Sequence, residues 1–193
     1  MNGAESLVRT LTACGVEVCF ANPGTSEMHL LAALDQGGGP RCVLGLFEGV
    51  VTGAADGYAR MAGKPAATLL HLGPGLGNGL ANIHNARRAR SPMVNIVGDH
   101  GTAHQGLESP LESDIEAVAA PFSDWVHSVA TADDLGRDTA SAIAAARHAP
   151  GRIATLIVPA DTAWNDGGAP ANGLPEVITP TKVADEQLSG IAD

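Results

Sequence analysis

Short apolar runs alternate along the chain with longer segments in which apolar residues recur at helical spacing. The runs predict strands and the longer segments predict helices. Strands are expected at 16–20, 41–46, 66–71, 93–98, 125–130 and 153–159, and helices at 7–14, 25–34, 48–63, 80–90, 113–119 and 132–148. Continuous apolar strands that alternate with helices are typical of a parallel sheet covered on both faces. The sequence therefore predicts a three-layer α/β/α fold with a mainly parallel sheet of about six strands.

The composition changes after Asp161, where glycine, proline and asparagine become frequent up to Pro180. Such a composition is typical of a linker. Residues 181–193 then begin a possible helix that stops unfinished. We therefore expect one domain at residues 1–165, followed at 166–193 by a linker and the start of a further, truncated domain.

Composition and charge argue against several classes of protein. Hydrophobic residues make up 45% of the chain and aromatic ones 3%, so small aliphatic residues must form the core. A formal net charge of −10 argues against a nucleic-acid backbone as partner. No apolar run approaches the ~18 residues of a membrane span. Residues 1–5 lack the pattern of a signal peptide, so the cytoplasm is the expected location. Cys14, Cys19 and Cys42 lie in apolar segments and are predicted to be reduced core residues.

Glu48 is the first candidate for chemistry. It follows the apolar run 42–47 and opens a helix made mostly of small residues. Apolar neighbours desolvate a carboxyl group and disfavour its ionised form, as in many catalytic acids. A glutamate in a first helical turn is also a common complement to the helix dipole. Gly49, Gly53 and Gly57 favour a functional interpretation, because each glycine costs roughly 1 kcal/mol in a helix and so predicts close contact with another helix or a partner subunit.

Two further segments contain candidates for a binding or metal site. The glycine-rich segment 73–79 follows a predicted strand, but its pattern is G-x-G-x-G-x-G, whereas dinucleotide-binding loops have G-x-G-x-x-G and P-loops carry a lysine. A tight turn without function accounts for it equally well. Asp99, His100 and His104 follow another predicted strand, but a metal site would need further ligands that this segment does not supply. No metal ligand is therefore assigned.

The segment Phe-Glu-Gly-Val-Val-Thr-Gly-Ala-Ala-Asp-Gly-Tyr-Ala-Arg-Met-Ala-Gly at 47–63 resembles the helix that carries the activating glutamate of thiamine-diphosphate-dependent enzymes of the acetolactate synthase and benzoylformate decarboxylase group. The resemblance extends over residues 1–165. Many relatives have a histidine before the glutamate, where this chain has Phe47. The resemblance implies the pyrimidine-binding domain of an enzyme acting on 2-keto acids.

The resemblance also implies roles for individual residues. Glu48 would activate thiamine diphosphate through a hydrogen bond to its aminopyrimidine ring, while the cofactor carries the carbon chemistry. A turn that contains Gly73, Pro74, Gly75 and Asn78 would pack against the pyrimidine.

Further implied site residues lie near the ends of other predicted strands. Pro23 and Gly24 belong to the family's Asn-Pro-Gly turn, and His71 falls where benzoylformate decarboxylase has an active-site histidine. Thr25 or Ser26 is at least equally expected to cap the helix that follows. The residues implied to face the substrate are Thr25, His104 and Gln105.

Members of this family continue into a middle domain and a diphosphate-binding domain, which has a Gly-Asp-Gly motif followed by an Asn-Asn pair. This sequence contains no Gly-Asp-Gly motif. The resemblance therefore implies that Mg²⁺ ligands lie on another chain or on a missing part of this one, that 166–193 starts the middle domain, and that the enzyme is a homodimer or tetramer. A non-catalytic homologue or a nucleotide-binding α/β module stays open as an alternative. The keto acid, decarboxylation or carboligation, and FAD binding also stay open.

Overall fold

The computed structural model describes residues 1–175, 182–184, 187–188 and 190. Parallel strands form a 6-stranded sheet in the order β2-β1-β3-β4-β6-β5. The strands are β1 (Val18–Asn22), β2 (Arg41–Leu44), β3 (Ala66–Leu70), β4 (Met93–Asp99), β5 (Trp125–Ser128) and β6 (Ile153–Pro159). The predicted parallel α/β architecture is confirmed, and β6 has the predicted bounds.

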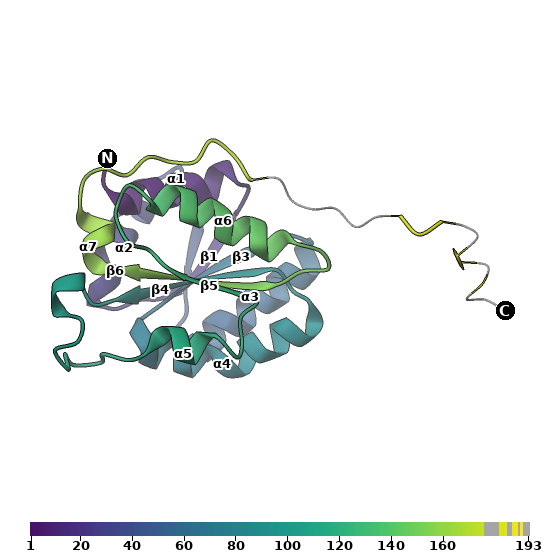
Figure 1. The fold of residues 1–193 in the computed structure, drawn as a ribbon, viewed down its shortest axis with the longest axis horizontal. Helices are drawn as coiled ribbons and strands as arrows, with labels where there is room; N and C mark the ends of the chain where they lie inside the picture. The colour runs from purple at the N-terminus through teal and green to yellow at the C-terminus, as the bar shows by residue number, and fades with distance from the viewer. Residues whose placement is uncertain (176–181, 185–186, 189, 191–193) are drawn as a thin grey trace.

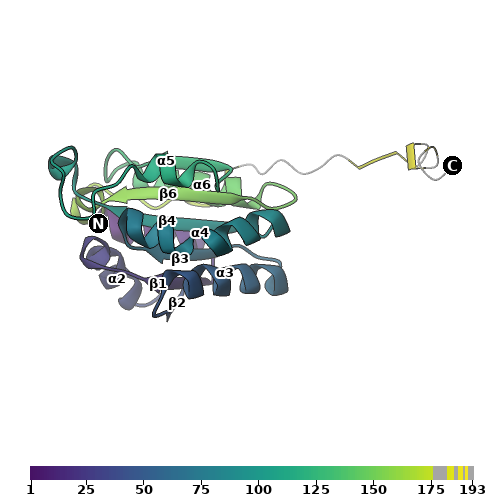
Figure 2. The same ribbon diagram turned by 90° about the horizontal axis from the view of Figure 1, so that it is seen from below.

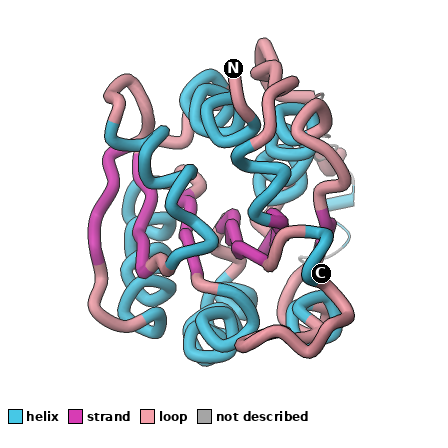
Figure 3. The backbone as a smooth tube through the Cα atoms, turned by 90° about the vertical axis from the view of Figure 1, so that its left-hand side faces the viewer, coloured by secondary structure: helices cyan, strands magenta, loops and turns pink. Residues whose placement is uncertain are grey.

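Helices cover both faces of the sheet, as Figure 1 and Figure 3 show. On one face the helices are α1 (Gly3–Ala13), α2 (Met28–Asp35) and α6 (Leu135–Arg147), whose apolar residues share one core cluster with the strands. On the other face they are α3 (Glu48–Ala62), α4 (Leu72–Ala89) and α5 (Ile115–Ala119), which share a second cluster. Figure 2 shows α3 and α4 side by side on this second face.

Polar side chains inside the sheet fix the strand register. Thr68, Asn95 and Thr155 occupy paired positions on β3, β4 and β6, and all are fully buried. Thr68 Oγ1 donates to Asn95 Oδ1 at 2.8 Å, and Asn95 Nδ2 donates to Thr155 Oγ1 at 3.3 Å. A slip of register would leave these groups buried without partners, at ~1–3 kcal/mol each. The register in turn fixes where the strands end and the loops of the site begin.

The glycine-rich segment 73–79 is helical, so its prediction as a loop was wrong. α4 begins at Leu72, and the segment forms its first turns. Leu72, Leu76 and Ile83 recur at helical spacing on the buried face. Burial of this face outweighs the helix penalty of the glycines. Gly75 N donates to His71 O at 2.8 Å, so the helix starts directly after β3.

The start of α2 also differs from the prediction. A short 3-10 helix, η1 (Thr25–Glu27), precedes α2, which begins at Met28 without a side-chain cap. The hydroxyl of Ser26 donates instead to Glu27 Oε1 at 2.8 Å. Neither Thr25 nor Ser26 therefore caps the helix.

Cys14 and Cys19 are buried as predicted, but Cys42 is exposed. Cys42 lies on β2, which is an edge strand whose neighbours Arg41 and Leu44 are exposed as well. The apolar run around Cys42 indicated a strand but not its place at the edge of the sheet. The prediction of a core position was wrong for this reason.

The chain continues to pack on the domain beyond the predicted change of composition. α7 (Ala160–Trp164) spans that point. Ala171 N then donates to Thr10 Oγ1 on α1 at 3.0 Å, and Leu174 packs against the core. The helix expected at 181–193 falls largely outside the described residues, and the domain boundary at 165 stays a prediction. Within the described ranges, no helix is long and apolar enough to cross a membrane.

Candidate active site

The carboxyl ends of β1 and β3 meet where the strand order of the sheet reverses. β1 lies between β2 and β3, and the helices that follow β1 and β3 pack on opposite faces. In open parallel sheets such a reversal leaves a crevice in which ligands bind. Gly24 follows β1 and faces the ring of His71, which follows β3; a Cβ at Gly24 would overlap that ring. The structure thus brings these two predicted residues together.

Glu48 lies at the same edge of the sheet, as the first residue of α3. It is only 8% exposed. Its Oε2 accepts a hydrogen bond from Asn78 Nδ2 at 3.0 Å. An added Cβ at Gly75 would stand 3.1 Å from Oε1. Of the predicted cofactor residues, Asn78 and Gly75 therefore contact the Glu48 carboxylate, and Oε1 has no hydrogen-bond partner among residues 1–175.

Close packing of α3 against α4 holds this carboxylate in place. Thr52 Oγ1 donates to Gly79 O at 3.0 Å, and Asn82 Nδ2 donates to Gly49 O at 2.7 Å. These bonds join the first turns of α3 to α4, which carries Asn78. The orientation of Glu48 is therefore set by two helices and not by a flexible loop.

The glycines of α3 have different neighbours. A Cβ at Gly53 would stand 2.9 Å from the Asn82 side chain on α4, which is the close helix contact that the spacing predicted. A Cβ at Gly49 would meet the Phe47 ring, and one at Gly57 would meet nothing within 4 Å. Only Gly53 is explained by packing against another helix within the described residues.

Glu27 is a site residue that sequence analysis missed. Its side chain is 0% exposed. It accepts hydrogen bonds from Gly24 N at 2.7 Å and from Ser26 Oγ at 2.8 Å, and His71 Nδ1 lies 2.8 Å from its Oε2. Gly98 on β4 makes room for it, since a Cβ there would overlap Oε1. The sequence placed Glu27 in a first helical turn, and nothing local indicates its burial against a strand far along the chain.

The turn after His71 is tight. Leu72 has a φ of 51°, in the left-handed region, although it is a branched residue and 2% exposed. Such a conformation costs of order 1–3 kcal/mol and persists only where the surrounding structure imposes it. It lets the chain pass from β3 into α4 within one residue. The ring of His71 is thereby held between Glu27 and Gly24.

A cavity of about 480 Å³ opens beside His71. Of the residues predicted to face the substrate, Thr25 and His104 line it and Gln105 does not. Gln105 Nε2 donates instead to Asp99 Oδ2 at 2.8 Å. Burial raises the pKa of Asp99. Other residues of the cavity wall are Ser26, Met28, His29, His100, Leu111 and Trp164.

The remaining predicted residues lie nearby but face other ways. Gly73 packs against the side chain of Ser113, not against Glu48. Pro23 is half-buried after β1, and Pro74 is exposed on the first turn of α4. In the part of the chain that the structure describes, no group of three or more His, Cys, Asp and Glu side chains is arranged to hold a metal ion.

Arg60, from the motif that resembles the family, forms an ion pair on its own helix. Its Nε and Nη2 donate to Asp56 at 2.8 and 2.7 Å. Burial opposes ionisation of Asp56, but the bonds from Arg60 and Ser91 outweigh it and keep the pKa of Asp56 below its ordinary value. Arg60 lies near the far end of α3 from Glu48, so its role is structural.

The chain is similar in sequence to known proteins over most of its length. A family model described as "Thiamine pyrophosphate enzyme, N-terminal TPP binding domain" matches residues 1–120. A candidate acetolactate synthase large subunit, IlvX, of Mycobacterium tuberculosis is 59% identical over 191 residues, covering 99% of this chain and 37% of the relative. Benzoylformate decarboxylase of Pseudomonas aeruginosa is 34% identical over 179 residues, covering 92% of this chain and 32% of the relative.

The likeness extends to solved structures. The thiamine diphosphate-dependent 4-hydroxybenzoylformate decarboxylase of Rhodococcus jostii RHA1 superposes with a TM-score of 0.86 at 26% identity, covering 99% of this chain and 36% of that one. The chain thus spans about a third of the length of the relatives that it matches.

Proposed function

Because the chain belongs to the thiamine pyrophosphate enzymes, through their N-terminal TPP binding domain, we propose that it supplies the pyrimidine-binding half of an active site that acts on 2-keto acids. The observation that carries the proposal is the Glu48 carboxylate. One oxygen is fixed by Asn78, and the other has no partner among the described residues and faces a glycine. This is the arrangement that a planar ring with a hydrogen-bonding edge can approach.

The residues present fit the aminopyrimidine of thiamine diphosphate. Gly75 leaves Oε1 of Glu48 accessible, whereas a side chain there would stand against it. Asn78 keeps the carboxyl group from rotating, so its open oxygen keeps one direction. When bound, thiamine diphosphate supplies the carbon nucleophile and electron sink that 2-keto acid chemistry needs. Glu48 would hold the hydrogen bond that activates it.

His71 is the group that we assign to the substrate. Glu27 lies against Nδ1, and Nε2 has no hydrogen-bond partner within residues 1–175. An ionised Glu27 requires a hydrogen on Nδ1, which leaves Nε2 of the neutral ring as an acceptor. His71 would therefore orient a substrate or move a proton at Nε2, on the wall of the cavity that Thr25 and His104 also line.

The other half of the site must come from elsewhere, and an exposed apolar surface beside Glu48 is suited to receive it. This surface comprises Leu44, Leu46, Phe47 and Val50, with exposed fractions of 68%, 90%, 49% and 60%. Contiguous exposed apolar side chains usually mark an interaction site. We propose that a diphosphate-binding domain covers it, from a second chain or from the continuation of this one, in a homodimer or tetramer.

That second half would also hold the metal. Mg²⁺ takes oxygen ligands together with the phosphates of its ligand, and the described part of this chain offers no cluster for it. The reaction we propose is decarboxylation or carboligation of a 2-keto acid. We propose the cytoplasm as the location of the protein, from the sequence alone.

A chimera tests this function. The present chain is joined to the part of the Mycobacterium tuberculosis relative beyond the aligned 191 residues, because the two proteins are 59% identical over the aligned residues that the present chain would replace. Thiamine diphosphate with Mg²⁺ should raise its melting temperature, and a panel of 2-keto acids should release carbon dioxide or yield ligated product. Stabilisation by ATP or NAD alone would indicate a nucleotide-binding module. A folded chimera that does not bind thiamine diphosphate would indicate a non-catalytic homologue.

A further inference from the structure

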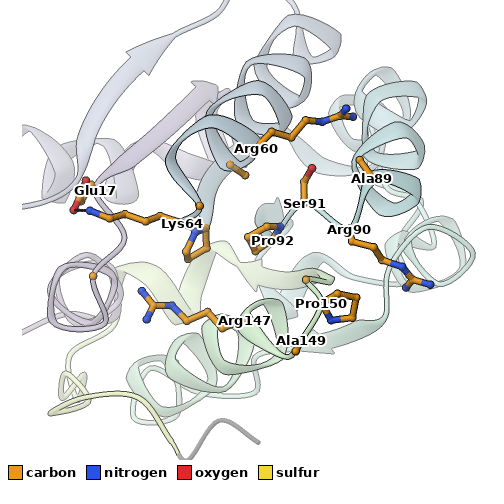
Figure 4. Close-up of a pocket in the computed structure, with 15 residues that line it drawn as sticks. Glu17, Arg60, Lys64, Ala89, Arg90, Ser91, Pro92, Arg147, Ala149 and Pro150 are labelled. Carbon is orange, nitrogen blue, oxygen red and sulfur yellow. Dashed lines mark hydrogen bonds and ion pairs between the residues drawn. The ribbon is translucent and has the colours of Figure 1, made fainter. Parts of the chain in front are cut away.

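A larger cavity lies at the amino ends of the strands, whereas Glu48 lies at their carboxyl ends. Its volume is about 940 Å³, and its lining residues precede β1, β3, β4 and β6 or belong to the ends of α3, α4 and α6 (Figure 4). We call it the amino-end cavity. The Glu48 site lies at the carboxyl ends of the strands, so the two sites are separated by the length of the sheet.

Positive charge is concentrated at this cavity. Arg60, Lys64, Arg90 and Arg147 line it, and an adjoining hollow of about 350 Å³ shares Arg90 and adds Arg87 and Arg88. The two linings contain more than half of the 11 Lys and Arg residues of the chain but a single carboxylate, Glu17. In a chain with a net charge of −10, this is a local reversal of sign.

Half of these cations are neutralised by ion pairs. Lys64 pairs with Glu17 at 2.5 Å, Arg60 with Asp56 at 2.7 Å, and Arg87 with Asp124 at 3.4 Å. The cations without a carboxylate partner among the described residues are Arg88, Arg90 and Arg147.

Arg147 also has an unused donor. Its Nη2 donates to Cys14 O at 2.9 Å, but its Nε is buried without a hydrogen-bond partner. Within the described ranges only one other buried side-chain atom, Ser6 Oγ, lacks a partner. Buried donors are nearly always satisfied in folded proteins. Because Nε is closed to solvent, an anion in the cavity would bind Arg147 through its Nη groups, of which Nη1 has no hydrogen-bond partner among the described residues.

Helix ends account for part of this charge. Cations are favoured in last helical turns, and Arg60, Arg87, Arg88 and Arg147 hold such positions. Each helix end carries about half a negative charge, so the four ends at α1, α3, α4 and α6 together offset about two cations. Three unpaired guanidiniums exceed that amount. The helix dipoles also leave the orphaned Nε of Arg147 unexplained.

The unpaired guanidiniums are spread out rather than convergent. Figure 4 shows Arg147 and Arg90 on opposite sides of the amino-end cavity with their guanidinium groups turned away from each other, while Lys64 reaches Glu17 on the same side as Arg147. A single small anion would not contact both. An anion that carries several phosphate groups would span them, and guanidinium forks match phosphate oxygens. We propose that the amino-end cavity binds a polyphosphate chain, either inorganic or the phosphate chain of a nucleotide.

Calorimetric titration of the 193-residue chain tests this site, with tripolyphosphate, ATP and orthophosphate as separate probes and no Mg²⁺. Tripolyphosphate should bind more tightly than orthophosphate, and added salt should weaken its binding because exposed charges are screened. Equal affinity for ATP and tripolyphosphate would mean that the phosphate chain suffices. Tighter binding of ATP would identify a nucleotide as the source.

Variants locate the binding. Arg90→Gln should weaken the binding of tripolyphosphate about tenfold, and Arg147→Gln should do the same. Each variant removes a hydrogen bond to a charged group. Arg9→Gln is the control: Arg9 is exposed on α1 and lines neither hollow. Arg147 also bonds to Cys14, so Arg90, whose side chain makes no hydrogen bond within the described residues, gives the deciding variant.

Two results would overturn the proposal. One is no binding of tripolyphosphate or ATP by the folded chain. The other is an equal loss of tripolyphosphate affinity in Arg9→Gln and Arg90→Gln, which would show that binding follows net charge alone. Binding that Glu48→Gln does not change would separate this site from the cofactor site, so failure of one proposal does not decide the other.

Discussion

Replacing Gly98 with alanine should disrupt the buried contact between Glu27 and His71. Gly98 lies on β4, which is paired with β3 on one side and β6 on the other, so its backbone cannot move aside. An added Cβ would overlap Oε1 of Glu27. Because Glu27 is fully buried, the carboxylate has no free space into which it can turn. The alanine must therefore displace it.

The size of the effect follows from the bonds that Glu27 makes. It accepts from Gly24 N and Ser26 Oγ and contacts His71 Nδ1. A hydrogen bond to a charged group contributes ~1.5–3 kcal/mol, so loss of two predicts a fall of roughly 3–6 kcal/mol in the free energy of unfolding. Gly77→Ala is the matched control. A Cβ there meets nothing within 4 Å, and alanine in a helix should add up to about 1 kcal/mol.

Urea unfolding followed by circular dichroism measures these changes. Glu27→Ala removes the obstructing carboxylate, so Gly98→Ala should cost little in that background. The double-mutant cycle should give a coupling energy of about 2 kcal/mol or more. The reasoning is refuted if Gly98→Ala unfolds at the wild-type urea concentration, or if it costs the same with and without the Glu27 side chain.

Two further predictions concern assembly and the isolated chain. Gly53→Leu should lower the melting temperature of the chain because it forces Asn82 off α3. Gly57→Leu should not lower the melting temperature, because a Cβ there meets nothing within 4 Å, yet it should reduce dimerisation of the chimera. Equal melting temperatures for the two variants would contradict this. The isolated chain should bind thiamine diphosphate through Glu48 no tighter than roughly millimolar, since two or three hydrogen bonds at ~1 kcal/mol each do not offset the loss of 4 kcal/mol or more on association. Micromolar binding that Glu48→Gln abolishes, measured by calorimetry with the amino-end arginines replaced, would contradict this.

The arrangement of the sheet was predictable because its signals are local. Strands such as 66–70 and 153–159 are continuous apolar runs, and burial on both faces follows from that pattern. Glu48 could be singled out for a similar reason, because the apolar run before it and the glycines after it are adjacent in sequence. The resemblance to a family then connected it to a cofactor.

The failures share a physical cause, which is that they depend on contacts between distant segments. Glycine indicated a loop at 73–79, but burial of Leu76 and Ile83 in the core beside the sheet makes it helical. Glu27 is buried because Gly98 leaves space for it on another strand. Cys42 is exposed because β2 is at the edge of the sheet, which the apolar run cannot reveal.

The central claim is that Glu48 activates thiamine diphosphate. The measurement that tests it most directly is the rate of hydrogen–deuterium exchange at C2 of the cofactor bound to the chimera, followed by proton NMR after acid quench. Glu48→Gln keeps the size of the side chain and should leave the fold unchanged, while Glu116→Gln, at an exposed position of α5, serves as control. We predict that exchange is abolished in Glu48→Gln and unchanged in Glu116→Gln. A wild-type exchange rate in Glu48→Gln, with the cofactor bound, would contradict the account.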